Sequence, residues 1–456
     1  MSKFLKPSKA APVLTGALIL SSLVSTEAFA AVESEVAYVF NTFSFLVHGI
    51  LVMFMAAGFA MLESGLVRAK NTTTICLKNM ALYSIAGIMF YLIGYNLMYV
   101  GVPEGGFIGS FSLFYNSSAA EIALLNADEA TAEQVKAVVD NGYSVASDWF
   151  FQMVFVATAA SVVSGTVAER IRVWPFMIFV AVLSAFIYPI QASWVWGGGW
   201  LAAMGFSDFA GSTLVHSVGG WSALTGALIL GPRKGKYGAD GRVNPMPGSN
   251  MPLATIGTFI LWFGWFGFNG GSQLALGSAA DATAMAIVYV NTNLGAASGV
   301  VAAMIMTQIM YKKIDLSMAL NGALGGLVAI TAGPDLQNHA LTMIVGAIGG
   351  LLVVISVPLL DKMKIDDVVG AVSVHLVAGI WGTLAVGIFG SGSIVTQAIG
   401  IVAIGAFVIV TSAATWFILK ATVGIRADEE DEVLGLDMAE CGMEAYPEFG
   451  RGSQTF

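Results

Sequence analysis

Cysteine and charge are both scarce in this chain, and each scarcity excludes a class of protein. Only Cys76 and Cys441 occur among its 456 residues, so the sequence offers neither a disulfide framework nor a thiolate site for a metal or cofactor. Charged residues make up 11% of the chain, whereas soluble domains average about 25%. The net charge of −9 is carried partly by an acidic C-terminal tail and says little about nucleic acid. Composition therefore places the chain outside the soluble range.

Hydrophobic residues are abundant instead, at 57% of the chain with a mean hydropathy of +0.79. Long apolar segments alternate with short polar turns, which predicts an all-α, polytopic membrane protein. We expect eleven transmembrane helices, the eighth rather short, at residues 37–62, 75–101, 148–168, 174–196, 208–231, 252–276, 283–310, 317–332, 340–360, 367–390 and 397–420.

The first thirty residues differ from the rest. Three lysines precede an apolar run at residues 13–24, and Ala28-Phe29-Ala30 follows it. We interpret residues 1–30 as a signal peptide cut after Ala30. An uncleaved first helix is the alternative, but the apolar run falls short of the roughly 20 residues that a span needs. The transmembrane domain is then expected at residues 31–420 and a cytoplasmic tail at 421–456.

Lysine and arginine gather in alternate loops, which predicts the orientation. They follow the odd-numbered helices, at Arg68, Lys70, Arg170, Arg172, Arg233, Lys234, Lys236, Arg242, Lys312, Lys313, Lys362, Lys364 and Arg426. Because such residues collect in cytoplasmic loops, the mature N-terminus is expected outside and the tail inside the cell. The long loop at residues 102–147 is then external, and we expect it to be a surface cap without a site.

Two stretches place a histidine eight residues after an aspartate: Asp208 precedes His216, and Asp367 precedes His375. Their helices are five spans apart, so they cross in opposite directions. Eight helical residues carry each ring about 12 Å inward, close to the middle of a hydrocarbon core about 30 Å thick. We expect the rings to meet at mid-depth between two inverted five-helix repeats, which a final helix follows. One buried histidine could be held merely by hydrogen bonds, but chance would have to place both.

Other titratable residues have plainer interpretations. His48 has no such counterpart and is expected only to hydrogen-bond a nearby carbonyl, and His339 is expected to be solvated in an external turn. An aspartate at a helix start caps backbone N–H groups. For Asp208 this is compatible with a contribution to a cation site, and the choice stays open. For Asp366 and Asp367, capping and ion pairing beside nearby lysines suffice.

Aromatic residues gather where helices meet the expected external face. Interfacial tryptophans usually anchor a protein in the bilayer. Three glycines after Trp196, however, leave its indole face free for a small cation. A metal ion or potassium would want several oxygen ligands, and apart from Asp208 we expect no carboxylate cluster at this mouth. A weakly held cation that donates hydrogen bonds and can lose a proton fits better, so ammonium is the predicted substrate.

Six stretches in order carry a resemblance to a known family: Gly65-Leu-Val-Arg-Ala-Lys-Asn71; Phe151-Gln-Met-Val-Phe155 leading to Ala168-Glu-Arg-Ile-Arg172; Trp196-Gly-Gly-Gly199; Asp208-Phe-Ala-Gly211 to His216; Gly264-Trp-Phe-Gly-Phe-Asn-Gly-Gly-Ser272; and His375 with Gly379-Ile-Trp-Gly382. The chain resembles ammonium transporters of the Amt/Mep/Rh superfamily over essentially all of the mature protein. The resemblance implies a homotrimer in the cell (inner) membrane with one pore per subunit, no enzymatic activity and no cofactor.

The resemblance also assigns roles to single residues. It implies an external recruitment site of Trp196, Phe155 and Ser272 that Asp208 supports, a stacked aromatic gate of Phe151 with Phe268, and a pore pair of His216 with His375. Ammonium would lose its proton near the gate, ammonia would cross the pore, and the proton would pass along the histidines.

Departures from the family pattern concern the pore and the tail. Ser212 and Leu376 stand where glycine is usual, and Cys441 and Met443 replace a histidine and a glutamate in the tail. The resemblance implies regulation by this tail, or by a PII-type signalling protein on the cytoplasmic face. An ammonium sensor is the alternative function, disfavoured because the chain ends without an output domain. A haem-bearing electron carrier is a third, because paired transmembrane histidines can ligate haem.

Overall fold

The computed structural model describes residues 33–449, so the expected signal peptide lies outside the described residues. Within that range the chain is helical and forms no β-strand. Ten helical segments there are long and apolar enough to cross a membrane. The expected eighth span, α14 (Leu316–Ile330), is apolar but has only 15 residues. The all-α, multi-span fold is thus confirmed, and the total of eleven spans stays a prediction.

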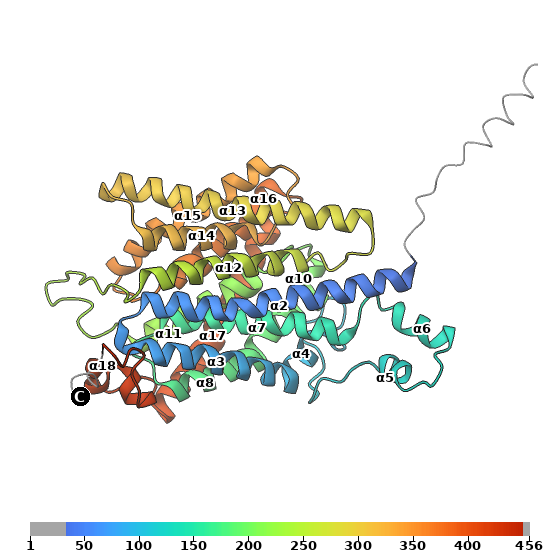
Figure 1. The fold of residues 1–456 in the computed structure, drawn as a ribbon, viewed down its shortest axis with the longest axis horizontal. Helices are drawn as coiled ribbons and strands as arrows, with labels where there is room; N and C mark the ends of the chain where they lie inside the picture. Colours follow the sequence, from blue (N-terminus) through green and yellow to red (C-terminus); the bar gives the residue numbers. More distant parts are fainter. Residues whose placement is uncertain (1–32, 450–456) are drawn as a thin grey trace, which may run out of the picture.

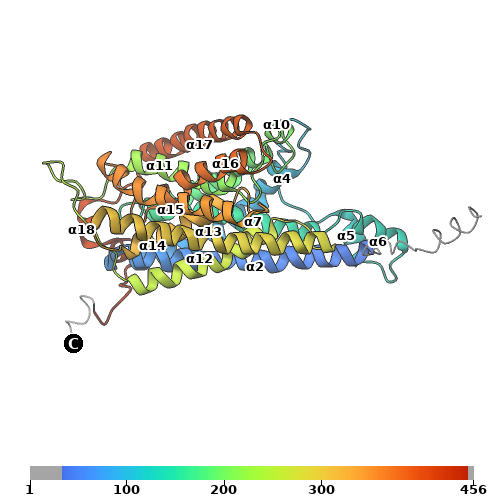
Figure 2. The ribbon, with the colours of Figure 1, turned by 90° about the horizontal axis from the view of Figure 1, so that it is seen from above.

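The helices that make up the apolar spans run along one axis of the molecule (Figures 1 and 2). They are α2 (Ser34–Leu66), α3 (Thr72–Met89), α4 (Tyr95–Tyr99), α7 (Val145–Thr166), α8 (Val173–Val182), α9 (Tyr188–Ser193), α11 (Val218–Leu230), α12 (Met251–Gly271), α13 (Ala279–Tyr311), α15 (His339–Lys362), α16 (Ala378–Phe389) and α17 (Ile394–Thr422). Two of the spans are composite, because a π-helical turn joins α3 to α4 and another joins α8 to α9.

The two ends of the bundle carry different short elements. The helices α5 (Ala119–Leu125) and α6 (Ala132–Val139) lie at one end, which we call the loop end (Figures 1 and 2). Helix α18 (Glu429–Leu434) lies at the opposite end, which we call the tail end. A ligand that crosses the bundle therefore passes between two unlike surfaces.

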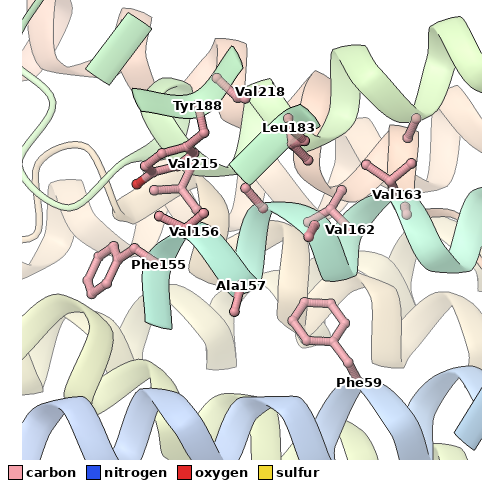
Figure 3. Close-up of a cluster of buried hydrophobic side chains, with 14 of the residues drawn as sticks. Phe59, Phe155, Val156, Ala157, Val162, Val163, Leu183, Tyr188, Val215 and Val218 are labelled. Carbon is pink, nitrogen blue, oxygen red and sulfur yellow. The ribbon is translucent and has the colours of Figure 1, made fainter. Parts of the chain in front are cut away.

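Helix α7 occupies the middle of the bundle, and nearly every residue from Phe151 onward is buried. It lies between α2, which carries Phe59, and the helices that carry Leu183 and Val215 (Figure 3). Small residues let neighbouring helices approach closely. For example, a Cβ added to Gly257 of α12 would lie 2.3 Å from the backbone nitrogen of Leu62 on α2. Close packing around α7 holds the aromatic side chains described below in fixed positions.

Both histidine segments begin with an irregular turn that the sequence does not predict. His216 lies in a π-helical turn, Ser212–Ser217, that leads into α11, and His375 lies in another, Val372–Val377, that leads into α16. The expected regular helix from Asp208 is therefore wrong over its first residues. Residues 208–211 precede the turn and are not helical, and among them Gly211 adopts a φ of 109°, a conformation that favours glycine. Such π turns often occur at functional sites.

Candidate functional site

The two histidine rings face each other inside the bundle. Their Nδ1 atoms are 3.2 Å apart, and the ring centroids are 5.2 Å apart at an interplanar angle of 25°. Both side chains are buried. Small residues let the two segments approach closely. Gly379, one turn after His375, packs against Ser217, which follows His216, and a Cβ on Gly379 would lie 2.5 Å from the Ser217 hydroxyl oxygen. The predicted proximity of His216 and His375 is confirmed.

This contact fixes how protons can be arranged on the pair. When two Nδ1 atoms share a hydrogen bond, one carries the proton and the other accepts it. The accepting ring then carries its own proton on Nε2, whereas the Nε2 of the donating ring is a bare acceptor. The Nε2 of His216 has no hydrogen-bond partner within residues 33–449. The pair can therefore take up a proton at one end and release one at the other.

A continuous stack of rings leads from His216 toward the loop end. The imidazole lies 5.1 Å from the Phe268 ring and 4.8 Å from the Trp265 ring, measured between centroids. Phe268 in turn stacks on Phe155, with centroids 4.0 Å apart at 26°. At that separation the two rings are in van der Waals contact, which leaves no passage between their faces for a hydrated ion.

The stacked pair differs from the predicted one. Phe151 with Phe268 was the expected gate, but the stack is made by Phe155 with Phe268. Phe151 lies one helical turn nearer the loop end on α7, so its ring contacts Phe155 instead, at 4.8 Å and 59°. The pairing of Phe151 with Phe268 is wrong, and Phe155 both stacks on Phe268 and lines the pocket at the loop end.

A pocket of about 330 Å³ opens at the loop end above this stack. Four of the predicted residues line it: Phe151, Phe155, Trp196 and Ser272. The Trp196 ring meets Phe155 edge-on at 6.0 Å. The Ser272 hydroxyl donates a hydrogen bond to the carbonyl of Phe268 at 2.8 Å, so its oxygen can still accept one. The structure thus brings the expected recruitment residues together in one pocket.

Asp208 is not among the residues that line this pocket. Its carboxylate accepts hydrogen bonds from four backbone N–H groups, those of Gly211, Ser212, Thr213 and Leu214, at 2.8–3.0 Å. Burial raises the pKa of this carboxyl, and those hydrogen bonds oppose the rise. Its backbone carbonyl accepts from the Trp196 indole at 3.2 Å. Asp208 therefore holds both Trp196 and the His216 turn in place.

Sequence reasoning missed several residues of this pocket. Asp148 and Gln152 line it from α7, Tyr95 and Tyr99 line it from α4, and Asn141 and Tyr143 come from the loop at 102–147. The expectation that this loop contributes no site is wrong. A signal for the α7 residues exists, because positions 148, 151, 152 and 155 fall on one helical face. The loop residues carry no such pattern.

The other two histidines lie outside the ring stack. His48 is held by the Ser44 carbonyl at 2.8 Å and by the Tyr289 hydroxyl at 2.9 Å, as its interpretation requires. His339 is the first residue of α15, and its Nδ1 lies 2.7 Å from the amide oxygen of Asn291. His339 is exposed, as expected, but it begins a helix instead of lying in a turn, and it is hydrogen-bonded to Asn291.

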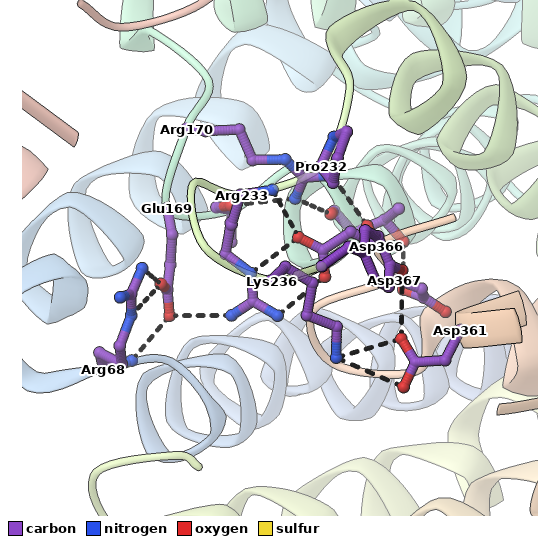
Figure 4. Close-up of polar contacts among 12 residues, drawn as sticks. Arg68, Glu169, Arg170, Pro232, Arg233, Lys236, Asp361, Asp366 and Asp367 are labelled. Atoms are coloured by element: carbon purple, nitrogen blue, oxygen red, sulfur yellow. Dashed lines mark hydrogen bonds and ion pairs between the residues drawn. The ribbon is translucent and has the colours of Figure 1, made fainter. Parts of the chain in front are cut away.

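The tail end carries buried charges instead of aromatic rings (Figure 4). The Arg233 guanidinium donates to both carboxylate oxygens of Asp366, at 2.9 and 2.8 Å, and lies 3.4 Å from Glu169. Glu169 also pairs with Arg68. Burial alone would raise the pKa of Asp366, but hydrogen bonds from Arg233 and the nearby guanidinium charges hold it well below its usual value. The partner of Asp366 is thus Arg233, from another loop, rather than a neighbouring lysine.

The C-terminal segment is tied to this charged surface. The Asp437 carboxylate accepts from the backbone N–H groups of Thr73 and Thr74, at 2.9 and 2.8 Å, and so caps the start of α3. Glu432 accepts from Arg426 at 2.7 Å. Within the described residues, no group of three or more His, Cys, Asp or Glu side chains could hold a metal ion.

Comparison with known proteins gives a consistent result. Residues 43–446 match the model of the Ammonium Transporter Family. The chain is 40% identical over 435 residues to ammonium transporter Amt2 of Archaeoglobus fulgidus, covering 89% of this chain and 87% of that one. It is 36% identical over 422 residues to Amt2 of Methanocaldococcus jannaschii, covering 90% and 91%.

Solved structures share the fold. A structure titled Sensor Amt Protein superposes with a TM-score of 0.79 at 36% identity, covering 89% of this chain and 98% of that chain. Mep2 of Candida albicans superposes with a TM-score of 0.75 at 26% identity, covering 91% and 92%.

Proposed function

The chain belongs to the Ammonium Transporter Family, and we propose that it moves ammonium by splitting the ion, so that ammonia crosses the pore and the proton travels along His216 and His375. It is a multi-pass membrane protein and no enzyme. The observation that carries the proposal is the 3.2 Å contact between the two Nδ1 atoms, directly behind the stack of Phe268 on Phe155.

The energetic reason for splitting the ion lies in the buried path. A bare ammonium ion taken out of water costs several kcal/mol or more, whereas a neutral amine costs far less. The pocket supplies aromatic faces and the Ser272 hydroxyl to hold the ion. Behind Phe268, the His216 imidazole can accept the proton that ammonium gives up. Potassium has no proton to lose, so this arrangement would reject it.

The test is an ammonium-evoked current in liposomes that contain the purified protein. We expect wild type to carry current with ammonium and none with potassium. His216→Ala and His375→Ala should each either lower the ammonium current at least about a hundredfold, the lower end of the range for one general acid–base group, or admit potassium. His339→Ala, which changes a histidine outside the stack, is the matched control. An active wild-type preparation that gives no response to ammonium would overturn the proposal.

Several further properties belong to the same proposal. We infer a cleaved signal peptide at residues 1–30, an external loop end, a cytoplasmic tail, a homotrimer in the cell (inner) membrane, and a PII-type partner at the tail end. Charge supports the orientation, because Arg68, Arg233 and Arg426 all lie at the tail end. Labelling of single cysteines placed at residues 133 and 430 in intact cells tests it: only the first should react with an impermeant reagent.

A second candidate is an ammonium sensor that uses the same pocket. The similarity to a structure titled Sensor Amt Protein favours it, and the docked C-terminal segment offers a surface through which binding can be transmitted. Uptake separates the two functions. A transporter restores growth on low ammonium to cells that lack their own transporters, whereas a pure sensor does not.

A further inference from the structure

One charged side chain lines the loop-end pocket, and neither the family resemblance nor the ring stack gives it a role. It is Asp148, one turn before Phe151 on α7. No lysine, arginine, histidine or other acidic residue from residues 33–449 is among the lining residues. The side chain is mostly shielded from solvent, with the residue 7% exposed. An isolated carboxylate in such a setting is costly unless something compensates for it.

The hydrogen bonds of Asp148 compensate for it only in part. The Tyr95 hydroxyl donates to Oδ2 at 2.9 Å, and the Gln152 amide donates to Oδ1 at 3.2 Å. An ionised carboxylate offers about four lone-pair positions. Asp208 fills all of its own with backbone N–H groups, whereas Asp148 receives only two donors from the described residues. Asp148 can therefore accept further hydrogen bonds from a ligand in the pocket.

Position along the helix places this carboxylate ahead of the stack. Asp148 and Phe155 are seven residues apart on one face of α7, so Asp148 lies about 10 Å nearer the loop end. A ligand that enters from the loop end meets Asp148 first and the Phe155 ring last. Tyr99, Tyr143 and Trp196 line the same pocket. Aromatic faces and an acceptor oxygen together suit a small cation that carries N–H donors.

We propose that Asp148 is a specificity-determining residue that binds the ammonium-type cation before it reaches the Phe155 and Phe268 stack. The inference rests on the proposed function and adds the charged group that the recruitment site otherwise lacks. The carboxylate makes the pocket select the charged species, ammonium or methylammonium, over neutral molecules of the same size. It does not take part in the later proton transfer, so it affects binding and leaves turnover unchanged.

A purely structural role makes a different prediction. In that case Asp148 serves only to tie α7 to α4 through Tyr95, and losing the tie would matter as much as losing the charge. Tyr95→Phe removes the tie and keeps the charge. Asp148→Asn removes the charge and keeps an oxygen that can accept from Tyr95. Asp148→Glu keeps the charge on a longer side chain.

The experiment measures ammonium-evoked current against ammonium concentration in liposomes that contain equal amounts of folded full-length protein. For Asp148→Asn we expect the half-saturating concentration to rise on the order of tenfold, the scale of one hydrogen bond to a charged group, with an unchanged maximal current. Asp148→Glu should recover much of the affinity, and Tyr95→Phe, which keeps the charge, should lose much less affinity than Asp148→Asn. Methylammonium should show the same pattern. Glu133→Gln, which removes an exposed charge from α6 at the same end, is the matched control.

Three outcomes would overturn the inference. They are equal affinities for Asp148→Asn and Glu133→Gln, an Asp148→Glu variant as weak as Asp148→Asn, and a loss of affinity in Tyr95→Phe as large as that in Asp148→Asn. If Asp148→Asn fails to fold, Asp148→Glu and Tyr95→Phe are each compared with wild type, and a tenfold loss of affinity in either overturns the inference. A wild-type protein without ammonium current contradicts the proposed function itself, whereas a normal wild type with an unaffected Asp148→Asn variant contradicts only this inference.

Discussion

The two aspartate-to-histidine segments share a spacing and a local structure but have different surroundings. In each, an aspartate caps the backbone of a π-helical turn that presents a buried histidine. Asp208 accepts from four N–H groups and supports Trp196 at the aromatic mouth. Asp367 accepts from the N–H groups of Ala371 and Val372 and from the Thr166 hydroxyl, beside a cluster of buried ion pairs.

This difference shows that one capping device can serve two purposes. At the loop end it positions neutral aromatic residues, which can hold a cation and let it go. At the tail end it adjoins the pairing of Asp366 with Arg233, a contact between distant loops (Figure 4). Both histidines need precise placement, and the capping aspartate provides it whether aromatic residues or buried ion pairs lie nearby. Changing either capping aspartate, or the ion pairs, therefore tests how much the caps and their surroundings each contribute to stability.

The largest expected effect comes from removing the more heavily used cap. Asp208→Ala leaves four N–H groups of a buried turn without acceptors, at about 1–3 kcal/mol each. We expect it to destabilise the fold by more than about 5 kcal/mol, and Asp367→Ala by about half as much, since only two N–H groups lose their acceptor there. Thermal unfolding in detergent measures both variants. Equal losses would show that the two caps are equivalent after all.

The next effect concerns the ion pairs that only the tail end contains. Arg233→Met removes the guanidinium that pairs with the buried Asp366 carboxylate, and we expect a loss of about 3–5 kcal/mol. Lys236→Met is the matched control, because Lys236 pairs with the more exposed Asp361 and should cost less than about 1 kcal/mol. Unfolding temperatures of the two variants check this. A similar loss of stability in both variants would mean that burial does not make the Arg233 ion pair more important to stability than an exposed pair.

Sequence alone predicts the helices, the proximity of the two histidines and four of the residues that line the pocket. Long apolar runs leave little choice of structure, and matched spacing in two segments of opposite direction brings His216 close to His375. The stack is a different case. Whether Phe151 or Phe155 meets Phe268 depends on the register between α7 and α12, which side-chain packing decides and which no local pattern records. Tyr143 escapes prediction for the same reason, because only tertiary structure brings its loop to the mouth.

The partner of Asp366 was also beyond sequence reasoning. Nearby lysines are the obvious candidates for an aspartate in a short loop. The structure instead selects Arg233, whose planar guanidinium can reach both carboxylate oxygens at once. Long-range pairing of this kind depends on how the loops fold over each other, and a single sequence does not contain that information in readable form.

The smallest expected effect is a change of stability with pH. The contributions of Asp366 at the tail end and of Asp208 at the mouth should change in opposite directions when pH is lowered. The pKa of Asp366 lies well below its usual value, so its stabilisation is fully present above about pH 4, the unfolded value, and is lost as pH falls further. The pKa of Asp208 is raised by burial. Its contribution is therefore fully present below about pH 4 and declines as pH rises through the folded value.

The unfolding temperature of wild type relative to each asparagine variant reveals this sign. From pH 7 down to pH 4, the advantage of wild type over Asp208→Asn should grow, whereas its advantage over Asp366→Asn should stay constant and then shrink below pH 4. The unaltered protein at each pH serves as the reference, which removes the general effect of acid on the detergent-solubilised fold. Parallel curves for the two variants would mean that the guanidinium groups at the tail end do not distinguish its carboxylates from the backbone-capped carboxylate at the mouth.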